Sequence, residues 1–359
     1  MLKVEINRTL QGFNLDIAFS VNGEVLGILG PSGSGKTMTL LCIAGLLDPD
    51  SGFIQLNDRV LFDSTKKLNL PPKDRNVGFV FQNYALFPHL SAGKNIAYGI
   101  RNRSREEVNH RVKVLIENMG LEGLQNRYPQ QLSAGQQQRV AVARALAPEP
   151  DILLLDEPFS ALDSLTKEQL ERQILDLRQF YKGNIILVTH DLAEAYRLSS
   201  RIAVYESGGI IQCDNKAKLI ASPANLTVAK ITGFRNLLLG TINEITDSHI
   251  SILVPELGTL KAVRYKHSRL LSGMSVTIGI SPEYVKITNH PGENTVYGSL
   301  SRIVEEIRGY RCFFQLNSAQ NTVYQLDAVI SKSDKNIIPT LGSKVHIHLP
   351  PEYLVVITH

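Results

Sequence analysis

The sequence has few cysteines, no long apolar run and no strong excess of one charge. Its three cysteines, Cys42, Cys213 and Cys312, lie far apart and form neither a CxxC pair nor a Cys/His pattern. Neither a disulfide framework nor a zinc site is therefore predicted, and a reducing cytoplasm suits such a chain. No apolar stretch approaches the roughly 20 residues of a spanning helix, and residues 1–20 lack the uninterrupted apolar core of a signal peptide. We expect neither a membrane span nor export.

The net charge is +4, from 38 basic and 34 acidic residues. This excess is too small to indicate a nucleic-acid partner, and none is expected. Apolar residues make up 43% of the chain and charged residues 20%. These fractions are ordinary for a folded protein and exclude collagen-like and disordered classes. A length of 359 residues predicts two domains.

Residues 1–232 have the pattern of an α/β domain. Val25–Leu29, Ile152–Leu155 and Ile185–Val188 are short apolar runs, which are typical of parallel strands buried on both faces. Ser104–Met119 and Ala134–Ala147 have helical spacing. We therefore expect a helical subdomain at about residues 88–147, inserted into the α/β domain.

Beyond residue 232, short strand patterns alternate with turn residues, which predicts a second, all-β domain over 233–359. This part of the sequence also repeats itself. Gly273–Tyr284 matches Gly342–Tyr353 without gaps, and Gly240-Thr-Ile resembles Gly298-Ser-Leu upstream. We expect two copies of one β module, at about 233–290 and 291–359.

A glycine-rich segment follows the first buried strand and precedes a helical run. It matches the pattern GxxxxGK(S/T) and comprises Gly30, Pro31, Ser32, Gly33, Ser34, Gly35, Lys36 and Thr37. In this context its N–H groups point at phosphate oxygens, the lysine reaches the β- and γ-phosphates, and the threonine hydroxyl ligates Mg²⁺. The alternative, an ordinary glycine-rich turn, does not account for the strand and helix around it. The segment predicts binding of a nucleoside triphosphate.

Polar residues stand where the buried strands end. Asp156 would hold Mg²⁺ directly or through water, and Glu157 would act as general base on the water that attacks the γ-phosphate. The alternative is an acidic helix N-terminus without catalysis. His190 follows the next strand, with Asp191 as the expected helix N-cap. We favour a contact with the γ-phosphate over a structural role for His190.

Two further segments are candidates for the same site. Gln82 follows the strand pattern Val77–Phe81 and begins an aromatic segment that runs to Pro88. This glutamine would sense the metal or the attacking water, although it could be an ordinary loop amide. Ser133 begins a helix whose first amides also suit a phosphate. The helix after the glycine-rich segment and the helix that begins at Ser133 have no obvious way to contact one γ-phosphate within a single chain. A head-to-tail pair of subunits is therefore predicted.

These motifs together resemble the ATPase subunit of an ABC transporter. The resemblance rests on the phosphate loop, Gln82, LSAGQ at 132–136, ILLLDEP at 152–158, and Ser160-Ala-Leu-Asp163 followed by His190. It covers residues 1 to about 232 and implies a P-loop ATPase homodimer that binds ATP and Mg²⁺ between its subunits. In that arrangement the LSAGQ residues of one subunit, Ser133, Gly135 and Gln136, complete the nucleotide site of the other.

The resemblance also implies roles for two more residues. Asp163 would communicate across the dimer interface, and Phe13 would stack on adenine. For Phe13 the alternative is a strand residue that faces the core. The sequence departs from the usual LSGGQ at Ala134. We expect a helical φ there, at which a Cβ is harmless, and we expect Gly135 to approach the phosphate closely.

The second domain resembles the OB-like regulatory domain, of the TOBE/Mop type, of importer ATPases. Residues 57–64, 70–75 and 232–236 are similar to molybdate/tungstate importer ATPases, although sulfate, iron(III) and polyamine importers share most of the chain. This resemblance implies a peripheral protein on the cytoplasmic face of the inner or plasma membrane. Its partners would be a permease docked near Gln82–Pro88 and, indirectly, an extracytoplasmic substrate-binding protein. The β domain would be a candidate site for an oxyanion.

Two other classes fit the motifs less well. A soluble ABC ATPase that acts on DNA or ribosomes normally has tandem cassettes or a long coiled-coil insertion, and the sequence has neither. A P-loop GTPase needs an Asn/Thr-Lys-x-Asp motif. The segments Thr166–Gln169 and Asn215–Lys218 both lack its aspartate.

Overall fold

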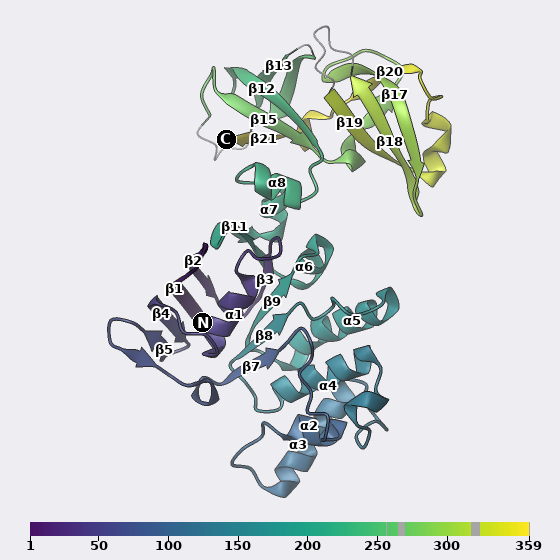
Figure 1. Ribbon diagram of the computed structural model, residues 1–359. Helices are drawn as coiled ribbons and strands as arrows, with labels where there is room; N and C mark the ends of the chain where they lie inside the picture. The colour runs from purple at the N-terminus through teal and green to yellow at the C-terminus, as the bar shows by residue number, and fades with distance from the viewer. Residues whose placement is uncertain (256, 265–269, 317–323, 359) are drawn as a thin grey trace. The chain divides into compact units, whose positions relative to one another are not determined.

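The computed structural model describes residues 1–255, 257–264, 270–316 and 324–358. The chain forms two compact units, Met1–Lys216 and Ala217–His359 (Figure 1). The second unit thus begins before the expected boundary at residue 232. Helix α8 (Leu226–Ile231) explains the difference, because its Ala229 packs with Phe234 and Ile357 of the β region. The short helix α7 (Lys216–Ala221) precedes it.

The first unit contains an 11-stranded sheet in the order β6-β5-β4-β1-β2-β11-β10-β3-β9-β8-β7. Strands β10, β3, β9, β8 and β7 pair in parallel, and β1 pairs antiparallel with β2 and β4. The strands are β1 (Leu2–Leu10), β2 (Phe13–Val21), β3 (Val25–Leu29), β4 (Ser51–Leu56), β5 (Arg59–Asp63), β6 (Leu68–Asn69), β7 (Val77–Val80), β8 (Ile152–Asp156), β9 (Asn184–Thr189), β10 (Arg201–Glu206) and β11 (Gly209–Asn215).

Helices cover both faces of the parallel part of this sheet. The helices of this region are α1 (Lys36–Ala44), α2 (Ala92–Ala97), α3 (Arg105–Asn118), α4 (Ala134–Leu146), α5 (Ser164–Phe180) and α6 (Leu192–Leu198), of which α2 and α3 pack on other helices. The residues of β8 are all apolar up to Leu155 because both faces of the strand are buried. Leu153 and Leu155 pack into the core beside α4 and α5, whereas Ile152 and Leu154 pack into the core beside α1. Helices α2 and α3 pack together, and α2 packs on α4 (Figure 1).

Among its described residues, the second unit contains two five-stranded sheets that share one core, in addition to α8. Their orders are β14-β13-β12-β15-β21 and β16-β20-β17-β18-β19. The strands are β12 (Asn236–Ile245), β13 (His249–Val254), β14 (Gly258–Val263), β15 (Ser275–Ile280), β16 (Lys286–Thr288), β17 (Thr295–Glu305), β18 (Gly309–Leu316), β19 (Tyr324–Ser331), β20 (Lys344–His348) and β21 (Val355–Thr358). The predicted fold class is confirmed: an α/β unit is followed by an all-β unit.

The sequence repeat is also a structural repeat. Each copy has a strand, a 3-10 turn and a short strand: β15, Pro282–Tyr284 and β16 in the first, β20, Pro351–Tyr353 and β21 in the second. The last strand of each copy pairs in the sheet of the other copy. The modules expected at 233–290 and 291–359 therefore exchange their final strands, and neither module forms its sheet alone.

The two copies of the repeat each contain a buried asparagine that makes equivalent hydrogen bonds. The side chain of Asn236 donates to the carbonyl of Asp327 and accepts from its N–H, at 2.9 and 2.6 Å. Asn294 makes the same pair of bonds to the backbone of Lys261, both at 2.7 Å. Each asparagine begins one copy and bonds to an edge strand of the other. These bonds stabilise the exchanged arrangement, because each satisfies backbone groups of the opposite copy.

Candidate functional site

The glycine-rich segment forms a tight loop between β3 and α1. Gly33 and Gly35 have φ of 78° and 100°, a left-handed conformation in which a side chain would be strained. The ammonium of Lys36 folds back across the loop and donates to the carbonyls of Gly30 and Pro31, at 2.9 and 2.8 Å. Burial lowers the pKa of Lys36, against the attraction of nearby carboxylates. The loop has the geometry of a phosphate cradle.

Thr37 and Asp156 supply oxygen atoms at the edge of this loop. The Thr37 hydroxyl donates to Oδ1 of Asp156 at 3.0 Å. Asp156 is the last residue of β8 and is only 5% exposed, and this burial raises the pKa of its carboxyl group. Hydroxyl and carboxylate oxygens beside a phosphate cradle are the ligands that Mg²⁺ prefers. The donor set therefore fits a magnesium ion.

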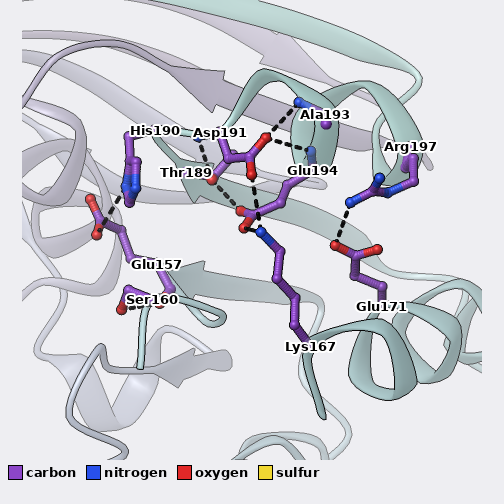
Figure 2. Close-up of polar contacts among 10 residues, drawn as sticks. All are labelled: Glu157, Ser160, Lys167, Glu171, Thr189, His190, Asp191, Ala193, Glu194 and Arg197. Carbon is purple, nitrogen blue, oxygen red and sulfur yellow. Dashed lines mark hydrogen bonds and ion pairs between the residues drawn. The ribbon is translucent and has the colours of Figure 1, made fainter. Parts of the chain in front are cut away.

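Three polar side chains meet at the carboxyl ends of β7, β8 and β9. Oε2 of Glu157 accepts from Nε2 of Gln82 at 3.3 Å and lies 3.5 Å from Nδ1 of His190. Figure 2 shows His190 and Glu157 pointing toward one another. Glu157 has a φ of 44°, and its N–H donates to the carbonyl of Val188 on β9 at 3.1 Å. A glutamate held in this strained conformation is typical of a functional position.

The loop after Gln82 is held by a residue that the sequence analysis did not identify as part of the site. Tyr84 and Ala85 both have positive φ, at 62° and 47°. The guanidinium of Arg144, on α4, donates to both of their carbonyls, at 2.8 and 2.6 Å. Buried Asn95 on α2 accepts from the N–H of Phe87 and donates to its carbonyl. Only the charge of Arg144 within the apolar run 140–146 hinted at this role.

Ser133 and Gln136 cap helix α4. The Ser133 hydroxyl accepts from the N–H of Gln136, and the Gln136 side chain accepts from the N–H of Ser133, at 3.3 and 3.0 Å. Ala134 is the first residue of α4 and its φ is not positive, so the expected helical conformation is confirmed. A Cβ on Gly135 would lie 2.1 Å from the methyl carbon of Thr166. Gly135 thus permits the close approach of α4 and α5, a constraint that the sequence did not predict.

Asp163 is the N-cap of α5. Its carboxylate accepts from the N–H groups of Leu165 and Thr166, both at 3.1 Å, and from the Thr166 hydroxyl at 2.6 Å. The bond from that hydroxyl, together with those from the backbone, holds the pKa of Asp163 below its usual value. Asp163 itself is exposed. Its position leaves it accessible to another chain.

A cleft brings seven of the predicted site residues together. It is lined by Leu10, Gln11, Phe13, Ser32, Gly33, Gly35, Lys36, Thr37, Met38 and Glu157. The tip of the Phe13 ring lies beside Gly35 of the phosphate loop and beside Gly208, and its stacking on adenine stays a prediction. Among the described residues, neither the LSAGQ segment nor Asp163 lines this cleft. One chain therefore brings together only part of the predicted set.

Comparison with known proteins identifies the family of this chain. The family profile described as ABC transporter matches residues 11–160. The spermidine/putrescine import ATP-binding protein PotA of Thermotoga maritima is 40% identical over 283 residues, which are 78% of this chain and 74% of that protein. The chain belongs to the ABC transporter family. It is therefore similar to ATP-binding subunits that serve import.

Other relatives of this ABC transporter chain are named for the import of different substrates. The molybdate/tungstate import ATP-binding protein WtpC of Archaeoglobus fulgidus is 43% identical over 246 residues, 68% of this chain and 99% of that protein. The sulfate/thiosulfate import ATP-binding protein CysA of Mycobacterium tuberculosis is 45% identical over 222 residues, 61% of this chain and 62% of that protein. The relatives thus agree on import and differ in substrate.

A solved structure has the fold of the first unit. It is the dimeric ATP-binding cassette MJ0796, in a post-hydrolysis state bound to ADP and Pi. It is 32% identical with a TM-score of 0.52, and it covers 60% of this chain and 99% of its own. The first unit of this ABC transporter chain is accordingly the cassette, and the second unit is additional. Within the described residues, no helix is both long and apolar enough to span a membrane.

Proposed function

We propose that this chain is the ATP-hydrolysing subunit of an importer for an oxyanion, molybdate or tungstate. One observation carries the hydrolytic part: the Glu157 carboxylate, between Gln82 and His190, lines the same cleft as Lys36 and Thr37. A carboxylate at this edge of a parallel sheet, beside a phosphate loop, is placed to act on the terminal phosphate.

The phosphate loop would bind the triphosphate. Its backbone N–H groups and the start of α1 would face the phosphate oxygens, and Lys36 would exchange its carbonyl partners for the β- and γ-phosphates. Phe13 would contact the adenine base from the wall of the cleft. Thr37, Asp156 and Gln82 would hold Mg²⁺, which neutralises charge on the phosphates when bound.

Glu157 would act as general base. Its carboxylate would accept a proton from the attacking water, a contribution of about 10²- to 10⁴-fold in rate. Gln82 would orient that water through its contact with the same oxygen, and His190 would contact the γ-phosphate. The strained φ of Glu157 keeps the carboxylate at this point of the sheet edge.

A second copy of the chain would complete the site. Ser133, Gly135 and Gln136 lie apart from the cleft of their own chain, yet they begin a helix whose amides suit a phosphate. In a head-to-tail pair each copy would cover the nucleotide of the other, with the exposed Asp163 at the interface. The dimeric cassette with ADP and Pi supports this arrangement.

The partner would be a permease embedded in the membrane, and this chain would bind it at the cytoplasmic face of the membrane. The aromatic segment from Gln82 to Pro88 is our candidate for the docking site. It is continuous with Gln82, so a movement of the permease would reach Glu157 directly. A substrate-binding protein outside the membrane would deliver the substrate.

Molybdate or tungstate is our proposed substrate because WtpC matches along nearly its whole length and residues 57–64 and 70–75 resemble that group. A polyamine is the second candidate. One observation favours it: the alignment with PotA extends over a larger share of this chain, beyond the cassette. The second unit would bind the oxyanion as a regulatory ligand if the first proposal holds.

Copurification would test the assignment. A tagged Glu157→Gln chain, held in its ATP-bound form, would be recovered from host membranes and its partners identified. The wild-type complex would then be reconstituted in vesicles with molybdate, tungstate, sulfate or spermidine. Uptake of molybdate or tungstate coupled to ATP hydrolysis supports the proposal, whereas uptake of spermidine alone supports the polyamine alternative. Recovery of ribosomes or nucleic acid in place of a permease contradicts both.

A further inference from the structure

A cluster of charges joins α5 to α6 beside His190, on the side of Asp191 (Figure 2). Lys167 on α5 forms ion pairs with Asp191 at 3.0 Å and with Glu194 at 2.5 Å. Asp191 is the residue after His190 and the N-cap of α6, where its Oδ1 accepts from the N–H of Ala193 at 2.7 Å. The ammonium of Lys167 thus holds the start of α6 through two carboxylates.

The same cluster reaches the end of β9. The Thr189 hydroxyl donates to Oε2 of Glu194 and accepts from the N–H of Asp191. The Glu194 side chain is only 8% exposed, so loss of these partners would leave a buried carboxylate without compensating contacts. Burial would lower the pKa of Lys167, but hydrogen bonds to Glu194 and Asp191 and their charges outweigh that effect and raise it. The residues on both sides of His190 are therefore fixed by one network centred on Lys167.

His190 itself has few restraints. Its side chain is 61% exposed, and its Nδ1 lies 3.5 Å from Glu157. The direction in which its ring points therefore depends on the backbone at residues 189–191. Lys167 and Glu194 bond to the residues on either side of His190, and Lys167 is not among the residues that line the cleft. We therefore expect a change at Lys167 to shift the imidazole without removing any group from the cleft.

We propose that Lys167 is a positioning residue for His190, acting through Asp191 and Glu194. The inference rests on the proposed function, because it assigns to Lys167 the control of a group that contacts the γ-phosphate. Lys167 also lies one turn after Asp163, the N-cap of α5. It thereby ties the helix that begins with Asp163 to the loop that carries His190.

The molecule contains a matched control for this contact. Arg197 on α6 pairs with Glu171 on α5 at 2.8 Å, one turn further along both helices and away from His190 (Figure 2). The Glu171 side chain is 7% exposed, close to the value for Glu194. Loss of either cation therefore leaves a buried carboxylate without its ion-pair partner, but of the two cations only Lys167 forms an ion pair with Asp191, the residue after His190.

The test compares Lys167→Met with Arg197→Met in the full-length chain. We expect both variants to lower the melting temperature similarly. Lys167→Met should lower kcat for ATP at least about tenfold with KM changed less than about threefold, whereas Arg197→Met should stay within about twofold of wild type in kcat. Lys167→Arg should restore most of the rate, because it keeps the charge. Equal rates for the two Met variants overturn the proposal.

A second variant and a measurement that does not depend on activity complete the test of Lys167. If Lys167→Met does not fold, Asp191→Asn replaces it, since asparagine caps a helix well but forms no ion pair with Lys167. Hydrogen exchange of the chain without nucleotide gives a readout that needs no activity. Amides of residues 191–194 should exchange at least about tenfold faster in Lys167→Met than in Arg197→Met. Equal exchange overturns the positioning role, whereas an inactive wild type with the expected exchange difference contradicts the ATPase assignment alone.

Discussion

At the scale of single residues, the structure gives Gly135 a role within its own chain. The sequence predicts that this glycine approaches a phosphate closely, which stays a prediction. Within the chain, a Cβ at this position would meet the methyl group of Thr166 on α5. The Thr166 hydroxyl bonds to Asp163 and fixes the rotamer that points this methyl group at α4. A side chain at position 135 would therefore separate the two helices.

Gly135→Ala should lower the free energy of unfolding by about 1–3 kcal/mol, the usual range for overpacking. The reason is the 2.1 Å approach of the new Cβ to Thr166. Urea unfolding of the chain without nucleotide measures this loss.

Thr166→Ser supplies the control, because it removes the methyl group and keeps the hydroxyl that bonds to Asp163. The double variant should regain most of the lost stability. If Gly135→Ala is equally destabilising with threonine or serine at 166, the steric explanation is wrong.

The meeting of the phosphate loop, Glu157 and His190 at one sheet edge could be predicted from the sequence, whereas their roles stay predictions. The phosphate loop, Glu157 and His190 each follow a short buried strand, and the carboxyl ends of parallel strands meet at one sheet edge. Arg144 and Lys167 could not be predicted in the same way. Each acts on a segment far from it in sequence, Arg144 on residues 84–85 and Lys167 on residues 191–194, and no local pattern records such contacts.

At the scale of elements, α4 connects the LSAGQ segment to the loop after Gln82. Ser133 caps its first turn, and Arg144 in its last turn holds the carbonyls of Tyr84 and Ala85. These two residues have left-handed backbone conformations that are costly without such partners. A rotation of α4 would therefore be transmitted to Gln82.

Arg144→Met should release the loop at 82–88. We expect a loss of about 2–3 kcal/mol in the free energy of unfolding, because two hydrogen bonds from a charged donor disappear. Limited proteolysis should cleave the loop faster, and ATP hydrolysis should fall with it.

Arg139→Met is a suitable comparison, because Arg139 also lies on α4 and donates to carbonyls, those of Met119 and Gly120. It should destabilise the chain without speeding cleavage at 82–88. Equal cleavage in both variants contradicts the assignment of the loop to Arg144.

At the scale of the whole molecule, the second unit depends on the exchange of strands between its repeats. The sequence predicts the repeat, since both copies of the strand and turn pattern are visible. It cannot predict the exchange, because an alignment of two copies does not record which sheet the last strand joins. In the structure β21 pairs with β15, and its Ile357 packs with Ala229 and Phe234.

A chain that ends at residue 354 should therefore lose the stability of the second unit. Removal of β21 leaves the edge of β15 unpaired and uncovers Ala229 and Phe234. Calorimetry should show a lower or absent transition for that unit. Glu352→Ala, at an exposed position in the preceding turn, should leave the transition in place. An unchanged transition in the truncated chain would show that β21 is dispensable.

We propose Glu157 as the general base of the ATPase site. The most direct test measures ATP binding and hydrolysis by the full-length chain with glutamate or glutamine at position 157. Glu157→Gln should bind ATP with Mg²⁺ as tightly as wild type and hydrolyse it at least about 100-fold more slowly. Hydrolysis by Glu157→Gln at the wild-type rate would contradict the role of Glu157 as general base.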